Sequence, residues 1–390
     1  MKSQRSVFFI LGWIGMFLYF TQRWLLGPLI PSLIQDFSIS KTLVGIIGSA
    51  SLWGYMITPV ISGLLSDRFG RKYPLLFGIL CFSAFTVVSG LARSPDQLIA
   101  ARFLTGVGEA FFSISIMAFT LELFPERPGF YLTFLTSGAS LGWFAGPAVA
   151  GWLFDLTGSW RWPFIVTGVT GLFVTALLFR FWPVSKKQGL SSHTFFDKAV
   201  LKPANLLMLL LLALTGSLQI ATEFGFTMWY PVFLKTELGM TATMAGLMAG
   251  IFGIGQFFGR PVMGLVSDRV GYRRVGAASS LLNGISVFLI LSAGSTLLRG
   301  IFTFQAGFLG AAVIGSLLTY SGLTFPTYKG LALGLIVTFA YSTASLAPVA
   351  MGYISDTYSV AVSLWSVCLP AAFLAGVPFL ATRLVRPSKE

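Results

Sequence analysis

Long apolar runs alternate with short polar loops along almost the whole chain. Most of the runs reach the roughly 20 residues that an α-helix needs to cross a lipid bilayer. The pattern therefore predicts an all-α integral membrane protein with twelve transmembrane helices. We place these helices at residues 7–33, 43–65, 73–92, 96–122, 130–154, 161–183, 205–234, 242–265, 274–293, 299–321, 330–352 and 361–383.

The composition supports this class. Hydrophobic residues make up 55% of the 390 residues and charged residues only 10%, whereas soluble domains carry about 25% charged residues. Because apolar runs fill nearly the whole chain, we expect one membrane body without an appended soluble domain.

A ten-residue segment occurs twice in the chain. Gly63–Lys72 (GLLSDRFGRK) returns 201 residues later as Gly264–Arg273 (GLVSDRVGYR). The chain is therefore predicted to be an internal duplication. We expect two six-helix halves, at 1–183 and 205–390, joined by a cytoplasmic linker at 184–204 and related by a pseudo-two-fold axis along the membrane normal.

The net charge of +13 is spread unevenly over the predicted loops. Eighteen lysines and arginines fall in the termini and loops on one side of the predicted membrane, and five fall on the other side. Short loops rich in Lys and Arg mark the cytoplasmic side. We therefore expect a multi-pass protein of the cell membrane with both termini in the cytoplasm, whose basic residues contact anionic lipids and not a nucleic acid.

Residues suited to covalent or metal chemistry are scarce. The chain has one histidine, His193, in the polar linker, and two cysteines, Cys81 and Cys368, in apolar runs. These residues cannot build a metal cluster, a disulfide framework, or a Ser/His/Asp or Cys/His set, and the sequence has no phosphate-binding loop motif. We therefore expect no enzyme activity, no cofactor and no metal site, and we expect two buried structural thiols.

The duplicated segment resembles a known motif. Gly63–Lys72 is similar to the signature between the second and third helices of the major facilitator superfamily, and the second copy resembles its counterpart, with Tyr272 in place of a basic residue. The resemblance covers all twelve predicted helices and implies transport by alternating access. It also implies conformational latches at helix ends, and the alternative for these charges is a role in membrane topology alone. The latch residues would be Asp67, Arg68, Arg71, Asp268 and Arg269.

Two further stretches are similar to motifs of this superfamily. Arg102–Ala110 (RFLTGVGEA) resembles the motif of its fourth helix, and Arg102 and Glu109 share one helical face because they are seven residues apart. The fifth predicted helix carries a glycine stripe with Gly146-Pro147, which resembles a motif associated with antiporters but also permits close helix packing. We favour packing for the stripe. We expect Arg102 and Arg260, which lie nearer opposite helix ends, to snorkel or to brace a helix end.

Ionisable residues inside the predicted spans are candidates for function, because a charge in the bilayer is costly. The deepest are Arg23, Glu109 and Glu223, in the first, fourth and seventh predicted helices. Arg23 lies eight residues before Pro31 and Glu223 eight residues before Pro231, so the duplication gives them corresponding positions. In the superfamily the first, fourth, seventh and tenth helices line the central cavity, and the resemblance implies that the three residues converge there.

Arg23 is the predicted anion-binding residue. Its guanidinium is a planar fork that can hold a carboxylate through two hydrogen bonds. Tyr19–Arg23 (YFTQR) resembles the first helix of the organic-anion branches, in which an arginine at this place binds the substrate carboxylate; those branches often have an acidic residue where this chain has Gln22. The alternative is a permanent ion pair of Arg23 with Glu223 or Glu109. The predicted substrate-binding residues are Arg23, Tyr19, Gln22, Gln219, Glu223, Gln305 and Tyr341.

Glu109 is the predicted proton carrier. A carboxylate in a water-poor site binds a proton more tightly, and a nearby arginine opposes this effect, so an anion on Arg23 can change the proton affinity of Glu109. The resemblance to anion:proton symporters implies the same role. Glu223 is either a second proton-coupling residue or a counter-charge for Arg23. The alternative for Glu109 is a structural carboxylate near Arg102.

These patterns predict a secondary active transporter that moves a small carboxylate-bearing organic anion by proton symport. We expect a monomer whose partners are the anion, protons and membrane lipids. A drug:proton antiporter or exporter is one alternative, although Arg23 fits cationic drugs poorly. A transporter of lysolipid-type amphiphiles is another, because it fits Gly108-Glu109-Ala110 and the aromatic content. A membrane enzyme or receptor finds no support in the residues of the chain.

Overall fold

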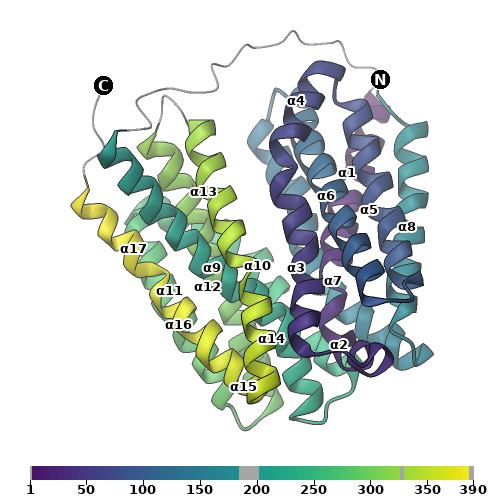
Figure 1. Cartoon of the computed structure of the whole chain (residues 1–390). Helices are drawn as coiled ribbons and strands as arrows, with labels where there is room; N and C mark the ends of the chain where they lie inside the picture. The colour runs from purple at the N-terminus through teal and green to yellow at the C-terminus, as the bar shows by residue number, and fades with distance from the viewer. Residues whose placement is uncertain (1, 184–201, 326–328, 386–390) are drawn as a thin grey trace. The chain divides into compact units, whose positions relative to one another are not determined.

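The structure is a computed structural model that describes residues 2–183, 202–325 and 329–385. Nearly all of these residues are helical (Figure 1). Most of the predicted linker at 184–204, including His193, lies outside the described residues. The helices are α1 (Lys2–Arg23), α2 (Leu26–Phe37), α3 (Lys41–Ile57), α4 (Pro59–Phe69), α5 (Lys72–Leu91), α6 (Pro95–Leu123), α7 (Pro128–Thr157), α8 (Arg161–Arg180), α9 (Pro203–Thr236), α10 (Ala242–Val270), α11 (Tyr272–Ser292), α12 (Thr296–Thr324), α13 (Lys329–Ala344), α14 (Ala347–Thr357), α15 (Val360–Ser363), the π-helical η2 (Leu364–Cys368), α16 (Leu369–Leu374), α17 (Gly376–Ala381) and the 3-10 turn η3 (Thr382–Leu384).

Each predicted span corresponds to one helix or to a run of consecutive helices. The pairs α1–α2, α3–α4 and α13–α14 and the run α15–α17 each form one span, and α5 to α12 form one span each. Within the described residues, ten of these spans are long and apolar enough to cross a membrane. The other two are the pair α3–α4 and the 30-residue helix α7. The predicted all-helical membrane fold is confirmed.

Proline explains where two of the spans are interrupted. A proline inside a helix has no N–H to donate, and its ring pushes against the carbonyl four residues earlier. Trp24 lies at the break between α1 and α2, and Pro28 comes four residues after it. Ala344 is the last residue of α13, and Pro348 comes four residues after it. The first break has the greater consequence for function, because it ends α1 at Arg23.

The described residues form two compact units. Unit 1 comprises those within 1–191 and 234–250, and unit 2 those within 192–233 and 251–390. Residues 234–250 pack with unit 1 because the Asp155 carboxylate at the end of α7 accepts hydrogen bonds from the N–H groups of Ala242 and Thr243, at 3.3 and 2.7 Å. The domain boundaries at 183 and 205 stay a prediction.

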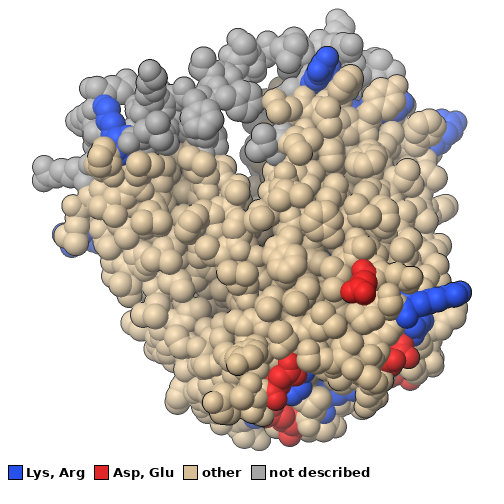
Figure 2. Space-filling model, viewed as in Figure 1, with Lys and Arg blue, Asp and Glu red and all other residues tan. Residues whose placement is uncertain are grey.

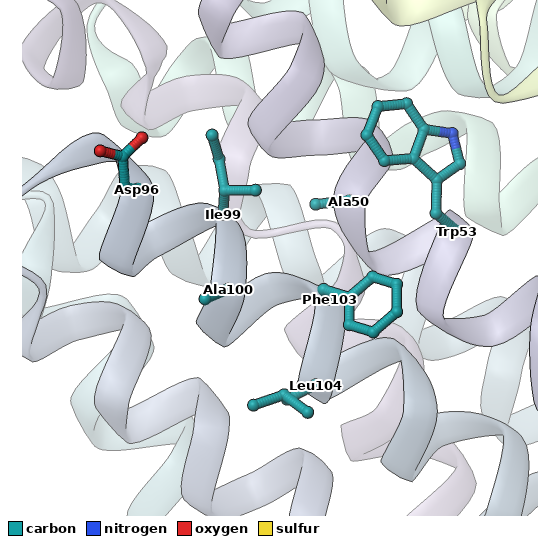
Figure 3. Close-up of a pocket in the computed structure, with 7 residues that line it drawn as sticks. All are labelled: Ala50, Trp53, Asp96, Ile99, Ala100, Phe103 and Leu104. Atoms are coloured by element: carbon teal, nitrogen blue, oxygen red, sulfur yellow. The ribbon is translucent and has the colours of Figure 1, made fainter.

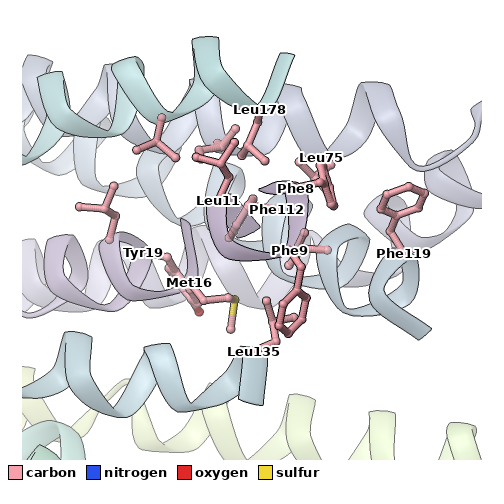
Figure 4. Close-up of a cluster of buried hydrophobic side chains, with 14 of the residues drawn as sticks. Phe8, Phe9, Leu11, Met16, Tyr19, Leu75, Phe112, Phe119, Leu135 and Leu178 are labelled. Atoms are coloured by element: carbon pink, nitrogen blue, oxygen red, sulfur yellow. The ribbon is translucent and has the colours of Figure 1, made fainter. Parts of the chain in front are cut away.

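The core of unit 1 is a cluster of buried apolar side chains (Figure 4). Its rings pack edge to face, with 5.1 Å between the centroids of Phe8 and Phe119 and 5.5 Å between those of Phe82 and Phe112. Such pairs are favourable beyond the area they bury. The cluster draws on α1, α5, α6, α7 and α8. It therefore fixes α1 against α6, the two helices that carry Arg23 and Glu109.

Unit 2 has a smaller apolar cluster of its own, with Met208, Leu317, Ile336 and Phe379 among its buried members. These side chains come from α9, α12, α13 and α17. Helix α11 packs closely against α17: a Cβ added at Gly276 of α11 would overlap the ring of Phe379 of α17. The cluster holds α9, which carries Glu223, against α12.

Large apolar side chains are exposed along the outer faces of the helices. Leu156, Phe173 and Phe179, for example, are 68%, 64% and 64% exposed. On the face shown in Figure 2, uncharged residues cover most of the surface. A membrane protein needs such an exposed apolar surface because its outer faces contact lipid tails.

Candidate functional site

Helix α1 ends inside its span, at Arg23, where buried Arg102 of α6 supplies hydrogen-bond donors. The last carbonyl groups of a helix have no partners within that helix. Arg102 donates from Nη1 to the carbonyl of Gln22 at 3.3 Å and from Nη2 to the carbonyl of Arg23 at 3.2 Å. The same Nη2 donates to Ser51 Oγ of α3 at 3.2 Å. Arg102 therefore braces the end of α1 and positions the residue that ends it.

Two glycines let α6 lie close to its neighbours. A Cβ on Gly106 would overlap the backbone of Ser51 in α3, and a Cβ on Gly108 would overlap the backbone of Phe82 in α5. Small residues at such points allow two helix backbones to approach closely. The glycines of the RFLTGVGEA stretch thus place Arg102 and Glu109 within reach of the end of α1.

Arg23 and Glu109 form a buried ion pair. The Arg23 guanidinium donates from Nη2 and Nε to Glu109 Oε2, at 2.6 and 3.0 Å. The two side chains are only 2% and 0% exposed. Removing two charges from water is costly, and their mutual attraction offsets that cost only when the geometry is good. Glu109 is one of the two partners that the sequence left open for Arg23.

Aromatic rings surround the Arg23 guanidinium. Its central carbon lies 4.8 Å from the ring centroids of both Tyr19 and Tyr55, and 5.7 Å from that of Phe20. A cation near the face of an aromatic ring is attracted to it. The contribution of Tyr55 was not predicted from the sequence, although its four-residue spacing from Ser51 places both polar side chains on one face of α3.

The second oxygen of Glu109 lacks a hydrogen-bond partner among the described residues. Oε1 is buried there without a donor, whereas Oε2 accepts both bonds from Arg23. A carboxylate oxygen with a vacant lone pair can take a proton without losing an existing hydrogen bond. Glu109 is therefore able to hold a proton and contact Arg23 at the same time.

Gln22 is held by hydrogen bonds at both ends of its amide. Its Nε2 donates to the carbonyl of Thr167 in α8 at 2.9 Å, and its Oε1 accepts from Thr86 Oγ1 of α5 at 2.7 Å. These bonds fix α1 against α5 and α8. Direct contact of Gln22 with a substrate stays a prediction, and it would require one of these bonds to open.

Unit 2 contains a buried polar cluster around Glu223 of α9. Gln219 Nε2 donates to Glu223 Oε1 at 3.1 Å, and Asn283 Nδ2 of α11 lies 3.4 Å from Gln219 Oε1. Gln256 of α10 belongs to the same cluster, and its Oε1 accepts a hydrogen bond from Arg260 Nη2 at 3.2 Å. Gln256 was not predicted from the sequence, although a polar residue one turn before Arg260 in an apolar run is a signal that could have found it.

The other two predicted residues of unit 2 are half-buried. Tyr341 of α13 packs edge to face on Phe224, with 5.6 Å between the ring centroids, and interacts electrostatically with Arg260 of α10. Gln305 of α12 makes no side-chain hydrogen bond within the described residues. The structure thus brings Tyr341 to the polar side of unit 2 and gives Gln305 no defined partner there.

The first predicted latch shows one long-range contact. Arg71 donates from Nε to Glu122 Oε1 at the end of α6, at 2.7 Å, and from Nη1 to Ser66 Oγ at 3.2 Å. Arg68 is exposed, and the Asp67 side chain lies outside the described residues. Arg71 therefore ties the α4–α5 loop to α6 within unit 1. Its role as a latch stays a prediction.

In the second predicted latch, the hydrogen bond found joins two residues of the same duplicated segment. The Tyr272 hydroxyl donates a hydrogen bond to Asp268 Oδ1. Tyr272, which stands where the motif has a basic residue, thus binds the Asp268 carboxylate. Arg269 is exposed. Gly70 and Gly271 have φ values of 84° and 103° in the two copies. Such values favour glycine because it lacks a Cβ, so the duplicated segment folds alike in both places.

A surface pocket of about 430 Å³ lies between α3 and α6. Asp96 stands at one end of it and Trp53 at the other, with Ile99 and Phe103 between them (Figure 3). Its lining is almost entirely apolar and contains none of the predicted site residues. The pocket suits a hydrocarbon chain better than an organic anion.

Named relatives of the chain include transporters of organic acids and a drug-resistance protein. It is 28% identical over 389 residues to the cis,cis-muconate transport protein of Acinetobacter baylyi, covering 95% of this chain and 92% of that protein. It is 26% identical over 302 residues to the 4-hydroxybenzoate transporter PcaK of the same species, with coverages of 68% and 66%. It is 29% identical over 296 residues to the multidrug resistance protein MdtG of Proteus mirabilis, with coverages of 72% and 71%.

Solved structures and a family model give the fold and the family. The fold is similar to that of a bacterial homologue of the human lysosomal transporter Spinster in an inward-facing and occupied conformation, with a TM-score of 0.84, 16% identity, and coverage of 99% of this chain and 98% of that one. The model of the Major Facilitator Superfamily matches residues 12–236 and 212–390. The matches span nearly the whole chain, and so this chain belongs to the Major Facilitator Superfamily of membrane transporters.

Proposed function

We propose that the protein is a proton symporter for small carboxylate-bearing organic anions. The observation that carries the proposal is the buried pair of Arg23 and Glu109, in which one carboxylate oxygen binds the arginine and the other has no partner among the described residues. The pair combines a cation that can bind an external carboxylate with an acid that can take up a proton.

The proposed coupling is an exchange of partners at Arg23. A substrate carboxylate competes with Glu109 for the guanidinium, because both offer the same two-oxygen acceptor. A buried carboxylate that loses its cation binds a proton more tightly. Glu109 therefore takes up a proton on its free Oε1 when the anion binds, and it releases that proton when the anion leaves and Arg23 returns. Substrate and proton then cross together, and the return step carries neither.

The surroundings of the pair support a flat, unsaturated acid as substrate. Tyr19, Phe20 and Tyr55 all lie within 6 Å of the Arg23 guanidinium, where their rings can also pack against a conjugated or aromatic carboxylate. Two of the named relatives transport cis,cis-muconate and 4-hydroxybenzoate, which are acids of this kind.

The remaining predicted site residues complete the proposal. Tyr19 and Gln22 of unit 1 and Gln219, Glu223, Gln305 and Tyr341 of unit 2 are proposed to contact the substrate. Glu223 is buried and accepts a hydrogen bond from the Gln219 amide, and we propose it as a second proton-coupling group. The two duplicated loops, with Asp67, Arg68, Arg71, Asp268 and Arg269, are proposed to hold one transport state. We further propose a monomer in the cell membrane with both termini in the cytoplasm.

The proposal is tested by the sign of a proton movement. The purified protein is placed in liposomes that contain a trapped pH dye, and 4-hydroxybenzoate or muconate is added outside. Proton symport predicts acidification of the lumen that disappears in Arg23→Gln and in Glu109→Gln. Liposomes that carry Glu126→Gln, an exposed loop carboxylate, serve as the matched control and should acidify like the wild type. Acidification that persists in both site variants would refute the proposal.

A drug:proton antiporter is the second candidate, because of the likeness to MdtG. In the same assay, a lipophilic cation added outside would then make the lumen alkaline, and organic anions would have no effect. The buried guanidinium of Arg23 argues against a cationic substrate at this site, because like charges repel strongly where water is scarce.

A further inference from the structure

The pocket between α3 and α6 has walls that are fixed by close contacts. A Cβ added at Gly54 of α3 would overlap the carbonyl group of Phe103 of α6, so the two helix backbones touch beside the pocket. From α5, Cys81 Sγ donates to the carbonyl group of Leu104 at 3.4 Å. The volume of about 430 Å³ lies in the range of about 300–1,000 Å³ that is typical of small-molecule sites. The pocket is therefore a lasting feature of unit 1 with room for a ligand.

The pocket extends from the headgroup depth of the membrane to the depth of the lipid tails. Helix α6 has 29 residues, so at 1.5 Å per residue it is about 43 Å long, whereas the hydrocarbon core of a bilayer is about 30 Å thick. Asp96 is the second residue of α6 and therefore lies in the headgroup region. Ile99 and Ala100 follow one turn deeper and Phe103 two turns deeper. Ala100 is exposed and the other two are half-buried, so a lipid tail can reach them.

Asp96 is available to bind a cation. It is exposed, and within the described residues it makes no ion pair and no side-chain hydrogen bond. Other residues cap the start of α6: Ser94 Oγ accepts from the N–H of Gln97 at 3.3 Å, and Gln97 Oε1 accepts from the N–H of Arg93 at 2.9 Å. The helix dipole also attracts a carboxylate in the first turn, but this attraction uses none of its acceptor sites. Asp96 can therefore accept hydrogen bonds from a group outside the protein.

The lining at the Asp96 end suits a primary ammonium group. Such a group carries N–H donors, and a carboxylate accepts them in short, charge-assisted hydrogen bonds. Quaternary ammonium groups are recognised by aromatic cages instead. The two aromatic residues of the lining, Trp53 and Phe103, stand away from Asp96 (Figure 3). An anionic headgroup would be repelled by the carboxylate.

We propose that this pocket binds a phospholipid with a primary-ammonium headgroup, of the phosphatidylethanolamine class. The ammonium group donates to the Asp96 carboxylate, and an acyl chain lies along Ile99 and Phe103 towards Trp53. A lipid fits because it joins a cation to an apolar chain, and the carboxylate and the apolar lining are offset by about 10 Å along α6. The chain contacts α3 and α6 together and so stabilises their packing. The inference is independent of the proposed function, because it involves neither Arg23 nor an anionic substrate.

Selectivity for the headgroup tests the role of Asp96. The purified full chain is stripped of lipid in detergent, and dioleoyl phosphatidylethanolamine or dioleoyl phosphatidylcholine is added. Native mass spectrometry gives the dissociation constant of each lipid. We expect the wild type to bind the ethanolamine lipid about fivefold more tightly, because only this lipid has N–H donors for the carboxylate. Asp96→Asn should bind both lipids alike. Glu126→Gln, which removes a carboxylate from an exposed loop position, should keep the wild-type ratio.

A larger side chain at position 100 tests the place of the acyl chain. Ala100→Phe fills the pocket and leaves Asp96 intact, and we expect it to weaken the ethanolamine lipid about fivefold because the chain loses its contacts. Ala100→Leu should have a smaller effect in the same direction. Ala176→Phe makes the same change at an exposed position of α8 and should bind this lipid like the wild type.

Three results would overturn the lipid site. The first is equal binding of the two lipids by the wild type, and the second is a wild-type ratio in folded Asp96→Asn. The third is wild-type affinity for the ethanolamine lipid in Ala100→Leu and in folded Ala100→Phe. The same spectra report the oligomeric state. A wild-type dimer that dissociates in Ala100→Phe would show that a second copy of the chain covers the pocket, and this would also overturn the proposal.

Discussion

The two oxygens of Glu109 have different environments, and this difference carries a testable consequence. Oε2 is bound to Arg23 and Oε1 is vacant among the described residues. If an anion must displace the charged carboxylate, anion binding should weaken as the pH rises. Glu109→Gln mimics the protonated acid and removes the competitor.

We therefore expect Glu109→Gln to bind organic anions with an affinity that stays nearly constant between pH 5.5 and 8. The wild type should lose about tenfold in affinity per pH unit, because one proton is taken up with each bound anion. Ligand-induced thermal shifts at several pH values measure both, with Glu126→Gln as the control. An equal pH slope in Glu109→Gln and the wild type would remove Glu109 from the coupling.

Arg102 is expected to matter for stability through the carbonyl groups of Gln22 and Arg23. Arg102→Met keeps much of the side-chain volume but leaves these two acceptors without a donor, and each buried unsatisfied group costs about 1–3 kcal/mol. We predict a clear drop in melting temperature in detergent, while Arg93→Met, at an exposed loop position, changes it little. Similar melting temperatures for the two variants would contradict the bracing role of Arg102.

The charged residues of the site and some uncharged ones, such as Tyr19 and Gln219, were predicted from sequence, whereas other uncharged ones were not. Arg23, Glu109 and Glu223 stand out because a charge in an apolar run needs a reason. Tyr55 and Gln256 carry no charge, and their one-turn spacing from another polar residue is a weaker signal, since single polar side chains are common in membrane helices. Which acid faces Arg23 also depended on how the helices pack, and spacing along the chain does not determine that.

At the scale of helices, close contact between helix backbones determines where α6 places Arg102 and Glu109. Gly106→Ala would push a methyl group into the backbone of Ser51, and overpacking typically costs about 1–3 kcal/mol. We predict that Gly106→Ala lowers the melting temperature and weakens anion binding, because α6 carries Glu109. Gly315→Ala in α12 meets open space and provides the control. Wild-type behaviour of Gly106→Ala would show that the helices can separate freely at this point.

The lengths of the apolar runs predicted where the membrane spans lie, but they did not predict where the helices within a span are interrupted. All twelve spans were predicted, but the breaks after Arg23, Ile57 and Ala344 were not. Proline alone does not reveal them, because Pro147 and Pro231 lie inside continuous helices. The bonds that Arg102 donates to the end of α1 are long-range, so the sequence around the break does not contain its full cause.

At the scale of the whole molecule, orientation in the membrane is open to a direct test. Both native cysteines are buried and form no disulfide, so we expect them to react little with a labelling reagent. We predict that a membrane-impermeant maleimide labels Arg93→Cys, in the α5–α6 loop, on intact cells. Glu126→Cys, in the α6–α7 loop, should react only after the membrane is opened. The reverse pattern would place the termini outside.

The hydrogen bonds of Gln22 limit which side chains position 22 accepts. The amide donates to the Thr167 carbonyl and accepts from the Thr86 hydroxyl. An ionised carboxylate at this position has no proton to donate, so it would face a backbone carbonyl with two repelling acceptors. No side-chain change at residue 167 removes that carbonyl. An ionised acidic residue at position 22 would therefore lose the bond to the Thr167 carbonyl and force α8 to move.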